Sequence, residues 1–140
     1  MTVNQNLLER PMETVASEPS KPTMFDKYGG VPTVTQIVRD FYHRVLTDLA
    51  LHRYFENVNT ERLIQHQIEL IAYIMGKPMR EFEKVRLTQV HQPQRITLSA
   101  YERLISILRQ VLLDAKIEGN DIISIIQKVD EYRSMIVFDA

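Results

Sequence analysis

Three polar side chains lie on helix faces that the sequence otherwise makes apolar. Tyr42 falls on the inner face of one predicted helix. In a second predicted helix, Gln67 lies roughly 40° from Leu63 on the apolar arc, and His66 lies roughly 60° to the other side. A buried polar group without a partner costs roughly 1–3 kcal/mol. Each residue alone is typical of a satisfied core position, but together they indicate a cavity that holds a polar ligand.

His91 is a fourth candidate, near the end of an irregular segment and directly before Gln92-Pro93. By itself, a histidine there is typical of a surface or capping position. The chain has no cysteine and no His-x-x-x-His or Glu-x-x-His cluster, so a multi-ligand zinc or di-iron site has little support. Haem brings four ligands of its own and needs only one protein histidine. Haem is therefore the metal cofactor that this set of residues favours.

The elements that must position these residues are helices. Apolar residues recur at three- and four-residue spacing and predict helices over residues 33–46, 60–75, from 97 or 99 onward, and 121–137. Expected N-caps are Thr33 with Gln36, Asn57 or Asn59, and either Thr97 or Ser99 with Glu102. No segment alternates with period two for long enough to predict a strand. The expected class is all-α, with four principal helices.

Composition fits one domain. The chain has 140 residues, 44% of them apolar, and a formal net charge of −1. No basic excess favours nucleic acid, and no apolar run approaches the ~20 residues that cross a bilayer. Residues 1–22 carry three prolines and few large apolar side chains, so we expect a mobile tail before a domain over residues 23–140. The N-terminus lacks a secretory pattern, so we expect a cytoplasmic protein.

Five segments follow one another in an order and at a spacing that are specific when taken together. They are Phe25–Gly30, Asp40–Asp48, Tyr54-Phe55-x-x-Val58, His66-Gln67, and Val90-His91 followed by Ile96-Thr97. In this order they resemble the truncated haemoglobins, group I most of all. The most specific match is Asp40–Asp48, which is similar to the family's Phe-Tyr-x-Arg-Val-Leu-x-Asp segment. The resemblance runs from about Met24 to Val137 and implies a two-over-two helical sandwich enclosing haem b (iron protoporphyrin IX).

The resemblance implies roles for the polar residues. His91 would be the proximal ligand to iron. Tyr42 and Gln67 would donate hydrogen bonds that stabilise a bound gas. His66 has two outcomes that the family allows: it stays near the haem edge, or it becomes a sixth ligand that an incoming gas must displace.

The resemblance also implies the residues that hold the porphyrin. Phe55 would stack on it, and Phe41 and Leu63 would line the same pocket. Arg62 would reach a haem propionate, with Arg86 as a weaker candidate. Leu63 stands where many relatives carry glutamine or another polar residue, so the distal hydrogen bonds would depend on Tyr42 and Gln67 alone.

The function that the resemblance implies is reversible binding of dioxygen or another diatomic gas, such as nitric oxide or carbon monoxide. It also implies nitric oxide detoxification, which needs a reductase that the sequence does not identify. In the alternative function, His66 and His91 both bind iron, and the protein transfers electrons or senses redox state. A further alternative is a helical interaction domain without a cofactor. We expect a monomer.

Overall fold

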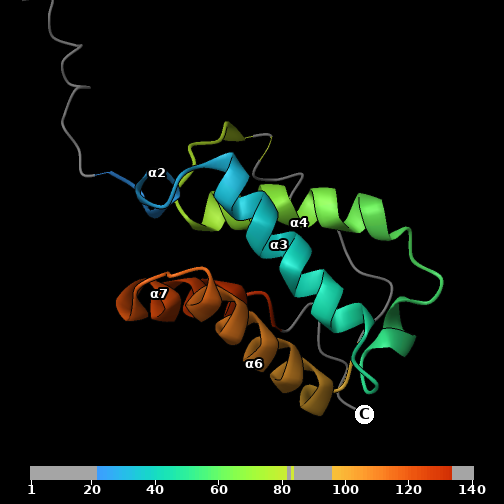
Figure 1. The fold of residues 1–140 in the computed structure, drawn as a ribbon. Helices are drawn as coiled ribbons and strands as arrows, with labels where there is room; N and C mark the ends of the chain where they lie inside the picture. Colours follow the sequence, from blue (N-terminus) through green and yellow to red (C-terminus); the bar gives the residue numbers. More distant parts are fainter. Residues whose placement is uncertain (1–21, 82, 84–95, 134–140) are drawn as a thin grey trace, which may run out of the picture.

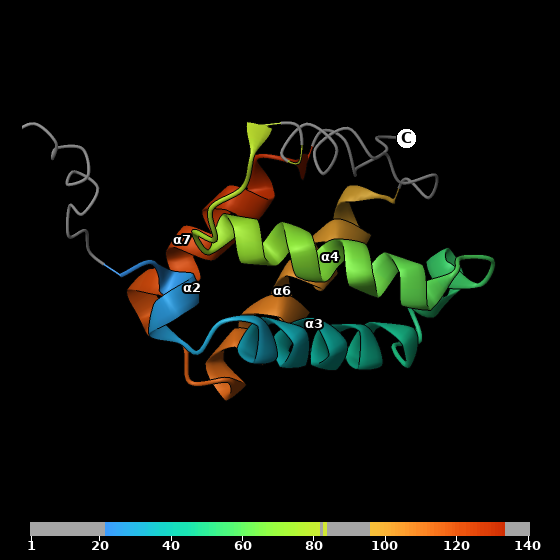
Figure 2. The ribbon, with the colours of Figure 1, turned by 90° about the horizontal axis from the view of Figure 1, so that it is seen from above.

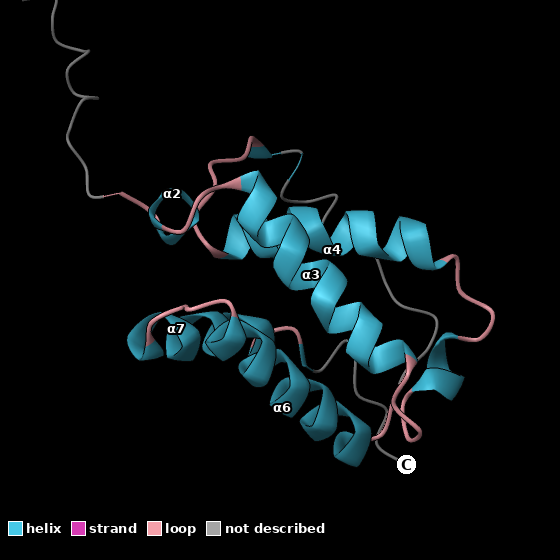
Figure 3. Ribbon diagram, viewed as in Figure 1, coloured by secondary structure: helices cyan, strands magenta, loops and turns pink. Residues whose placement is uncertain are grey.

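Every regular element that the structure describes is a helix. This computed structural model describes residues 22–81, 83 and 96–133. The helices are α2 (Met24–Lys27), α3 (Val31–Leu46), η1 (His52–Phe55), α4 (Thr60–Ile74), α6 (Leu98–Asp114) and α7 (Gly119–Asp130), drawn in Figures 1 and 3. The predicted all-α class is confirmed. Outside the described residues lie Arg86, His91 and all of the predicted tail except Pro22.

The four long helices form two layers. Helices α3 and α4 pair in one layer, and α6 and α7 pair in the other, as Figures 1 and 2 show. Helix α3 also packs on α6, and α4 packs on α7, so both members of the first layer contact the second. Short α2 lies beside the start of α7 (Figure 2). No helix in the described ranges is long and apolar enough to span a membrane.

The core lies between these layers. Its most deeply buried side chains are Val34, Ile37, Val45, Leu51, Met75, Val111, Leu112 and Ile125. The predicted inner face of α3 is buried at Val34, Ile37, Val38, Tyr42 and Val45. On α4, Ile68 and Ala72 are buried as well, beyond the predicted stripe. The three- and four-residue spacing therefore identified the inward face of both helices.

Helix α3 begins two residues before the predicted cap, so the prediction of Thr33 as N-cap is wrong. The N-cap is Gly30, whose φ of 75° favours glycine. Pro32 fits the first turn because that turn needs no amide hydrogen from it. The Thr33 hydroxyl instead donates to the carbonyl oxygen of Tyr28 at 2.5 Å.

Helices α4 and α6 begin at caps that the sequence predicted. The Asn59 side-chain oxygen accepts from the amide of Arg62 at 3.1 Å, and α4 ends just before Gly76, which has a φ of 108°. The Thr97 hydroxyl accepts from the amide of Ala100 at 3.1 Å and caps α6. The alternative start at Ser99 is wrong.

Helix α7 differs from its predicted span at both ends. It begins at Gly119, two residues before the predicted Asp121, because the side chain of Tyr28, the residue after α2, caps it. The Tyr28 hydroxyl accepts from the amide of Glu118 at 3.0 Å and donates to Asp121 Oδ2 at 2.6 Å. The helix ends at Asp130, where the amides of the next two residues bond three residues back and tighten the last turn. The predicted continuation through residues 134–137 lies outside the described residues.

Candidate functional site

Tyr42 is a buried phenol on the inner face of α3. Its side chain is 8% exposed, and burial raises the pKa of the phenol well above its ordinary value. No residue in the described part of the chain makes a hydrogen bond with its hydroxyl. Buried polar groups in proteins nearly always have a partner. The Tyr42 hydroxyl is therefore a protonated group whose hydrogen-bonding capacity the described residues do not use.

Two phenylalanine rings pack edge-on against Tyr42. The ring centroids of Phe41 and Tyr42 are 4.9 Å apart with an interplanar angle of 85°, and those of Tyr42 and Phe55 are 6.0 Å apart at 79°. Edge-to-face geometry at these distances is favourable for aromatic pairs. Phe41 lies on α3 and Phe55 on η1, and both are half-buried. The structure thus brings three of the predicted site residues together in one aromatic cluster: Phe41, Tyr42 and Phe55.

Helix α4, which packs on α3, carries four more of the predicted residues. Leu63 is buried, and His66 and Gln67 are half-buried. The Gln67 carboxamide is a second polar group on these two helices that makes no hydrogen bond within the described ranges. Arg62 is exposed in the first turn of α4, and among described residues its guanidinium forms no ion pair. Its side chain is accessible to an anionic group.

The other two predicted site residues, His91 and Arg86, lie outside the described residues. The structure therefore describes Tyr42, Gln67 and their apolar neighbours, and does not test the proximal ligand. The described residues include no group of three or more His, Cys, Asp or Glu side chains that could hold a metal ion. Apolar and aromatic side chains with two unpartnered polar groups fit a large apolar cofactor that binds a small polar ligand.

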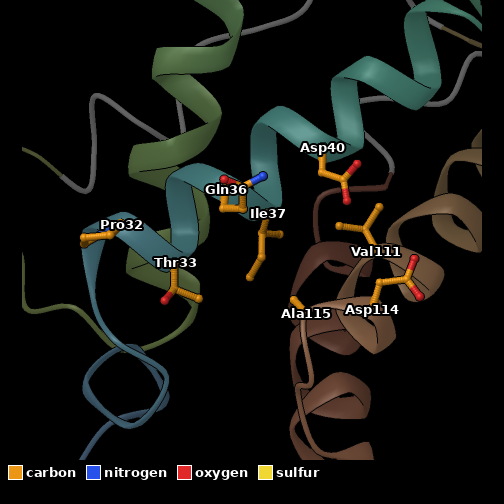
Figure 4. A pocket seen from close by; sticks show the side chains of 8 residues that line it. All are labelled: Pro32, Thr33, Gln36, Ile37, Asp40, Val111, Asp114 and Ala115. Atoms are coloured by element: carbon orange, nitrogen blue, oxygen red, sulfur yellow. The ribbon is translucent and has the colours of Figure 1, made fainter.

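A separate surface groove lies between α3 and α6, as Figure 4 shows. Its volume is about 490 Å³, and it is lined by Pro32, Thr33, Gln36, Ile37, Asp40, Val111, Asp114 and Ala115. The Arg44 guanidinium bonds both carboxylates of this lining, at 3.1 Å from Asp40 and 2.7 Å from Asp114. None of the predicted site residues lines it, so the groove is distinct from the aromatic cluster.

Sequence reasoning missed the ion pair between Asp48 and Arg103. Arg103 Nε donates to Asp48 Oδ1 at 3.0 Å and to Oδ2 at 2.8 Å. The Asp48 carboxylate raises the pKa of Arg103, and the guanidinium lowers the pKa of the Asp48 carboxyl below its ordinary value. The sequence contained one local signal for Asp48: it lies just after a predicted helix, where an aspartate often organises the following turn. Its partner, 55 residues away, gave no signal.

Several solved structures that superpose on this chain are truncated hemoglobins. The truncated hemoglobin of Tetrahymena pyriformis, in its Fe(III) form, superposes with a TM-score of 0.68 at 18% identity, over 83% of this chain and 98% of its own. The group II truncated hemoglobin of Bacillus anthracis superposes with a TM-score of 0.71 at 22% identity, over 86% and 95% of the two chains. The fold is the two-over-two globin fold.

Sequence comparison identifies the family. The model of the family described as "Bacterial-like globin" matches residues 23–138, and the chain belongs to this family. A group 1 truncated hemoglobin of Tetrahymena thermophila is 27% identical over 112 residues, which cover 80% of this chain and 91% of that protein. The group 1 truncated hemoglobin GlbN of Mycolicibacterium paratuberculosis is 29% identical over 104 residues, or 74% and 76% of the two chains. The resemblance to truncated haemoglobins is confirmed.

Proposed function

We propose that this chain holds haem b with His91 as the proximal ligand and binds dioxygen reversibly. Membership of a globin family implies a haem cofactor and the binding of a diatomic gas. The observation that carries the proposal of dioxygen binding is the buried Tyr42 hydroxyl, which has no hydrogen-bond partner among the described residues. Leaving such a group unpartnered costs roughly 1–3 kcal/mol, so a donor kept there has a use.

The described residues are suited both to hold haem and to stabilise a bound gas. Leu63, Phe41 and Phe55 offer apolar and aromatic surface for the porphyrin. Arg62 offers an exposed guanidinium for a propionate, and we propose Arg86 as a second, weaker candidate for that contact. When bound, haem supplies an iron centre at which a diatomic gas coordinates.

Tyr42 is suited to stabilise a polar gas because its hydroxyl is buried and has no hydrogen-bond partner among the described residues. The phenol stays protonated across the physiological pH range and can always donate a hydrogen bond. The Gln67 carboxamide would add a second donor from α4. A fixed donor in a water-excluding site acts more strongly than the same group in water. We infer that Tyr42 contributes most to retaining the gas and Gln67 contributes less.

The optical spectrum of the purified full chain, expressed with ample haem supply, tests this proposal. We expect a Soret band, a high-spin ferrous spectrum without gas, and loss of normal axial ligation in His91→Gly. A chain that takes up no hemin would contradict the proposal. A low-spin ferrous spectrum would instead identify the bis-histidine alternative, with His66 as the second ligand.

Nitric oxide detoxification is a further part of the proposal, since a protein that retains dioxygen can convert nitric oxide to nitrate. It needs a reductase to return the iron to the ferrous state. Stopped-flow mixing of the oxygenated protein with nitric oxide tests the conversion to nitrate, which does not involve the reductase.

We also propose that residues 23–140 are the globin domain, to which the family match over 23–138 lends support. The monomeric state and cytoplasmic location stay predictions.

A further inference from the structure

We propose that the ion pair between Asp48 and Arg103 positions Phe55 against Tyr42 and so sets the geometry of the gas-binding side of the site. The functional consequence rests on the proposed function above, whereas the positioning itself does not. The pair joins the turn after α3 to the second turn of α6, and Arg103 Nη2 lies 2.5 Å from Asp48 Oδ2. Two guanidinium nitrogens contact one carboxylate, which fixes its orientation as well as its position.

Asp48 is the less exposed member and organises the backbone around itself. Its side chain is 9% exposed, against 56% for Arg103. Its Oδ1 accepts from the amide of Ala50 at 2.9 Å, and its carbonyl oxygen accepts from the amides of Leu51 at 3.1 Å and His52 at 3.0 Å. Leu51 is the N-cap of η1 and is fully buried. One residue therefore directs the turn by which the chain leaves α3 and enters η1.

The end of η1 carries the ring that contacts Tyr42. Phe55 is the last residue of this short helix, and its ring is the only one outside α3 that packs on Tyr42 among the described residues. The side chain of Thr97, the N-cap of α6, lowers the pKa of Tyr54 in the same short helix. The position of Phe55 thus depends on α6 through the ion pair between Asp48 and Arg103. Helix α6 is also the first long described helix after His91 in the sequence, so this connection links the gas side to the segment that follows the predicted proximal ligand.

The chain contains a matched control for this role. Arg44 bonds Asp114 at 2.7 Å and so also joins α3 to α6 through an arginine and an aspartate. That pair lies at the other end of α6, and within the described part of the chain it makes no hydrogen bond or ion pair with η1. If Arg103 merely held the two helices together, Arg44→Gln and Arg103→Gln would have the same effect on the aromatic cluster. If Arg103 positions Phe55, only Arg103→Gln alters it.

The experiment compares wild type, Arg103→Gln and Arg44→Gln as full chains loaded with hemin and reduced, under carbon monoxide for the two spectroscopic readouts and under dioxygen for the release rate. The readouts are the nuclear Overhauser contacts between the Tyr42 and Phe55 rings, the C–O stretching band, and the rate of oxygen release. For Arg103→Gln we expect weaker ring contacts, a broadened or split band, and oxygen release faster by roughly two- to tenfold, the range for loss of one aromatic edge contact. For Arg44→Gln we expect wild-type values.

Two further variants keep the result interpretable. Arg103→Lys retains the charge but loses the two-nitrogen contact, so we expect a smaller change of the same kind. This variant also tests the proposal if Arg103→Gln is too unstable to study. Asp48→Asn retains an oxygen for the Ala50 amide but loses the ion pair, and we expect it to match Arg103→Gln. Unchanged ring contacts in these variants, or equal changes in Arg44→Gln, would overturn the positioning role. Failure of wild type to take up hemin would overturn the proposed function, and the ring contacts would still decide the positioning role.

Discussion

Two regions of this molecule use tyrosine in opposite ways. At the corner between α2 and α7, the Tyr28 hydroxyl donates to Asp121 at 2.6 Å and accepts from the amide of Glu118 at 3.0 Å. In the aromatic cluster, the more deeply buried Tyr42 hydroxyl has no hydrogen-bond partner among described residues. The Tyr28 hydroxyl stabilises the fold, whereas we propose that the Tyr42 hydroxyl binds a ligand.

The difference shows how a functional polar residue can be distinguished from a structural one. Residue type is the same at the two sites, so the sequence alone does not separate them. What separates them is whether the surrounding protein satisfies the hydroxyl, because an unsatisfied buried donor lowers stability unless something else binds it. Four predictions, from the largest expected effect to the smallest, can break or sharpen this comparison.

Tyr42→Phe has the largest expected effect, and the effect is on gas binding. We expect oxygen release to accelerate by roughly 10- to 100-fold, the range for loss of a hydrogen bond to a charged or strongly polar acceptor. The free energy of unfolding at equal hemin saturation should change by less than about 1 kcal/mol, because no described protein hydrogen bond is lost. Stopped-flow release and urea unfolding measure the two quantities. An unchanged release rate would remove Tyr42 from the gas-binding side.

Tyr28→Phe should lower the stability of the fold and leave gas binding unchanged. It removes one hydrogen bond to a carboxylate and one from the cap of α7, so we expect the free energy of unfolding to fall by about 1–3 kcal/mol. Oxygen release should stay at the wild-type rate. The same two measurements apply, and Tyr42→Phe is the matched control. A change in oxygen release without a loss of stability would contradict the structural role of Tyr28.

The stability that Tyr28 supplies should depend on pH through Asp121. The Tyr28 hydroxyl, and then Lys27, lower the pKa of the Asp121 carboxyl below its ordinary value of 3.8. A carboxyl whose pKa is lower in the folded state stabilises the protein fully above its unfolded pKa and loses that contribution as the pH falls. The gap in unfolding free energy between wild type and Tyr28→Phe should therefore be widest near neutral pH and narrow below about pH 4. Urea titrations across this range test it, and a gap independent of pH would exclude Asp121 as the partner that matters.

Lys27→Met should have the smallest effect. Lys27 Nζ lies 3.0 Å from both Glu118 and Asp121, but the side chain is 43% exposed, and exposed ion pairs contribute little. We expect a small loss of stability that disappears at about 1 M salt, where screening is strong. Lys128→Met, on the exposed side of α7, is the control. A loss larger than that of Tyr28→Phe would show that charge, and not the phenol, holds this corner.

Much of the fold could be predicted because its determinants are local. Asn59 and Thr97 cap α4 and α6 as expected, since a cap is read from a side chain and an amide three residues away. The inner faces of α3 and α4 followed from apolar spacing. Part of the candidate site followed in the same way, because Tyr42 and Phe41 share one helix. The prediction of Thr33 as a cap was wrong because Gly30 and Pro32 offered an earlier start that the apolar pattern does not reveal.

By itself, the sequence determined where helices form, which faces they bury, and that a tyrosine with no local partner lies on one of those faces. Only the tertiary structure decided where α7 begins, since Tyr28 caps it from 90 residues away. Only the tertiary structure also placed Phe55 edge-on to Tyr42 and joined Asp48 to Arg103 across 55 residues. The physical reason is that caps and apolar stripes act over one or two helical turns, whereas a hydroxyl or a carboxylate can be satisfied by any segment that the packing of the core brings near it.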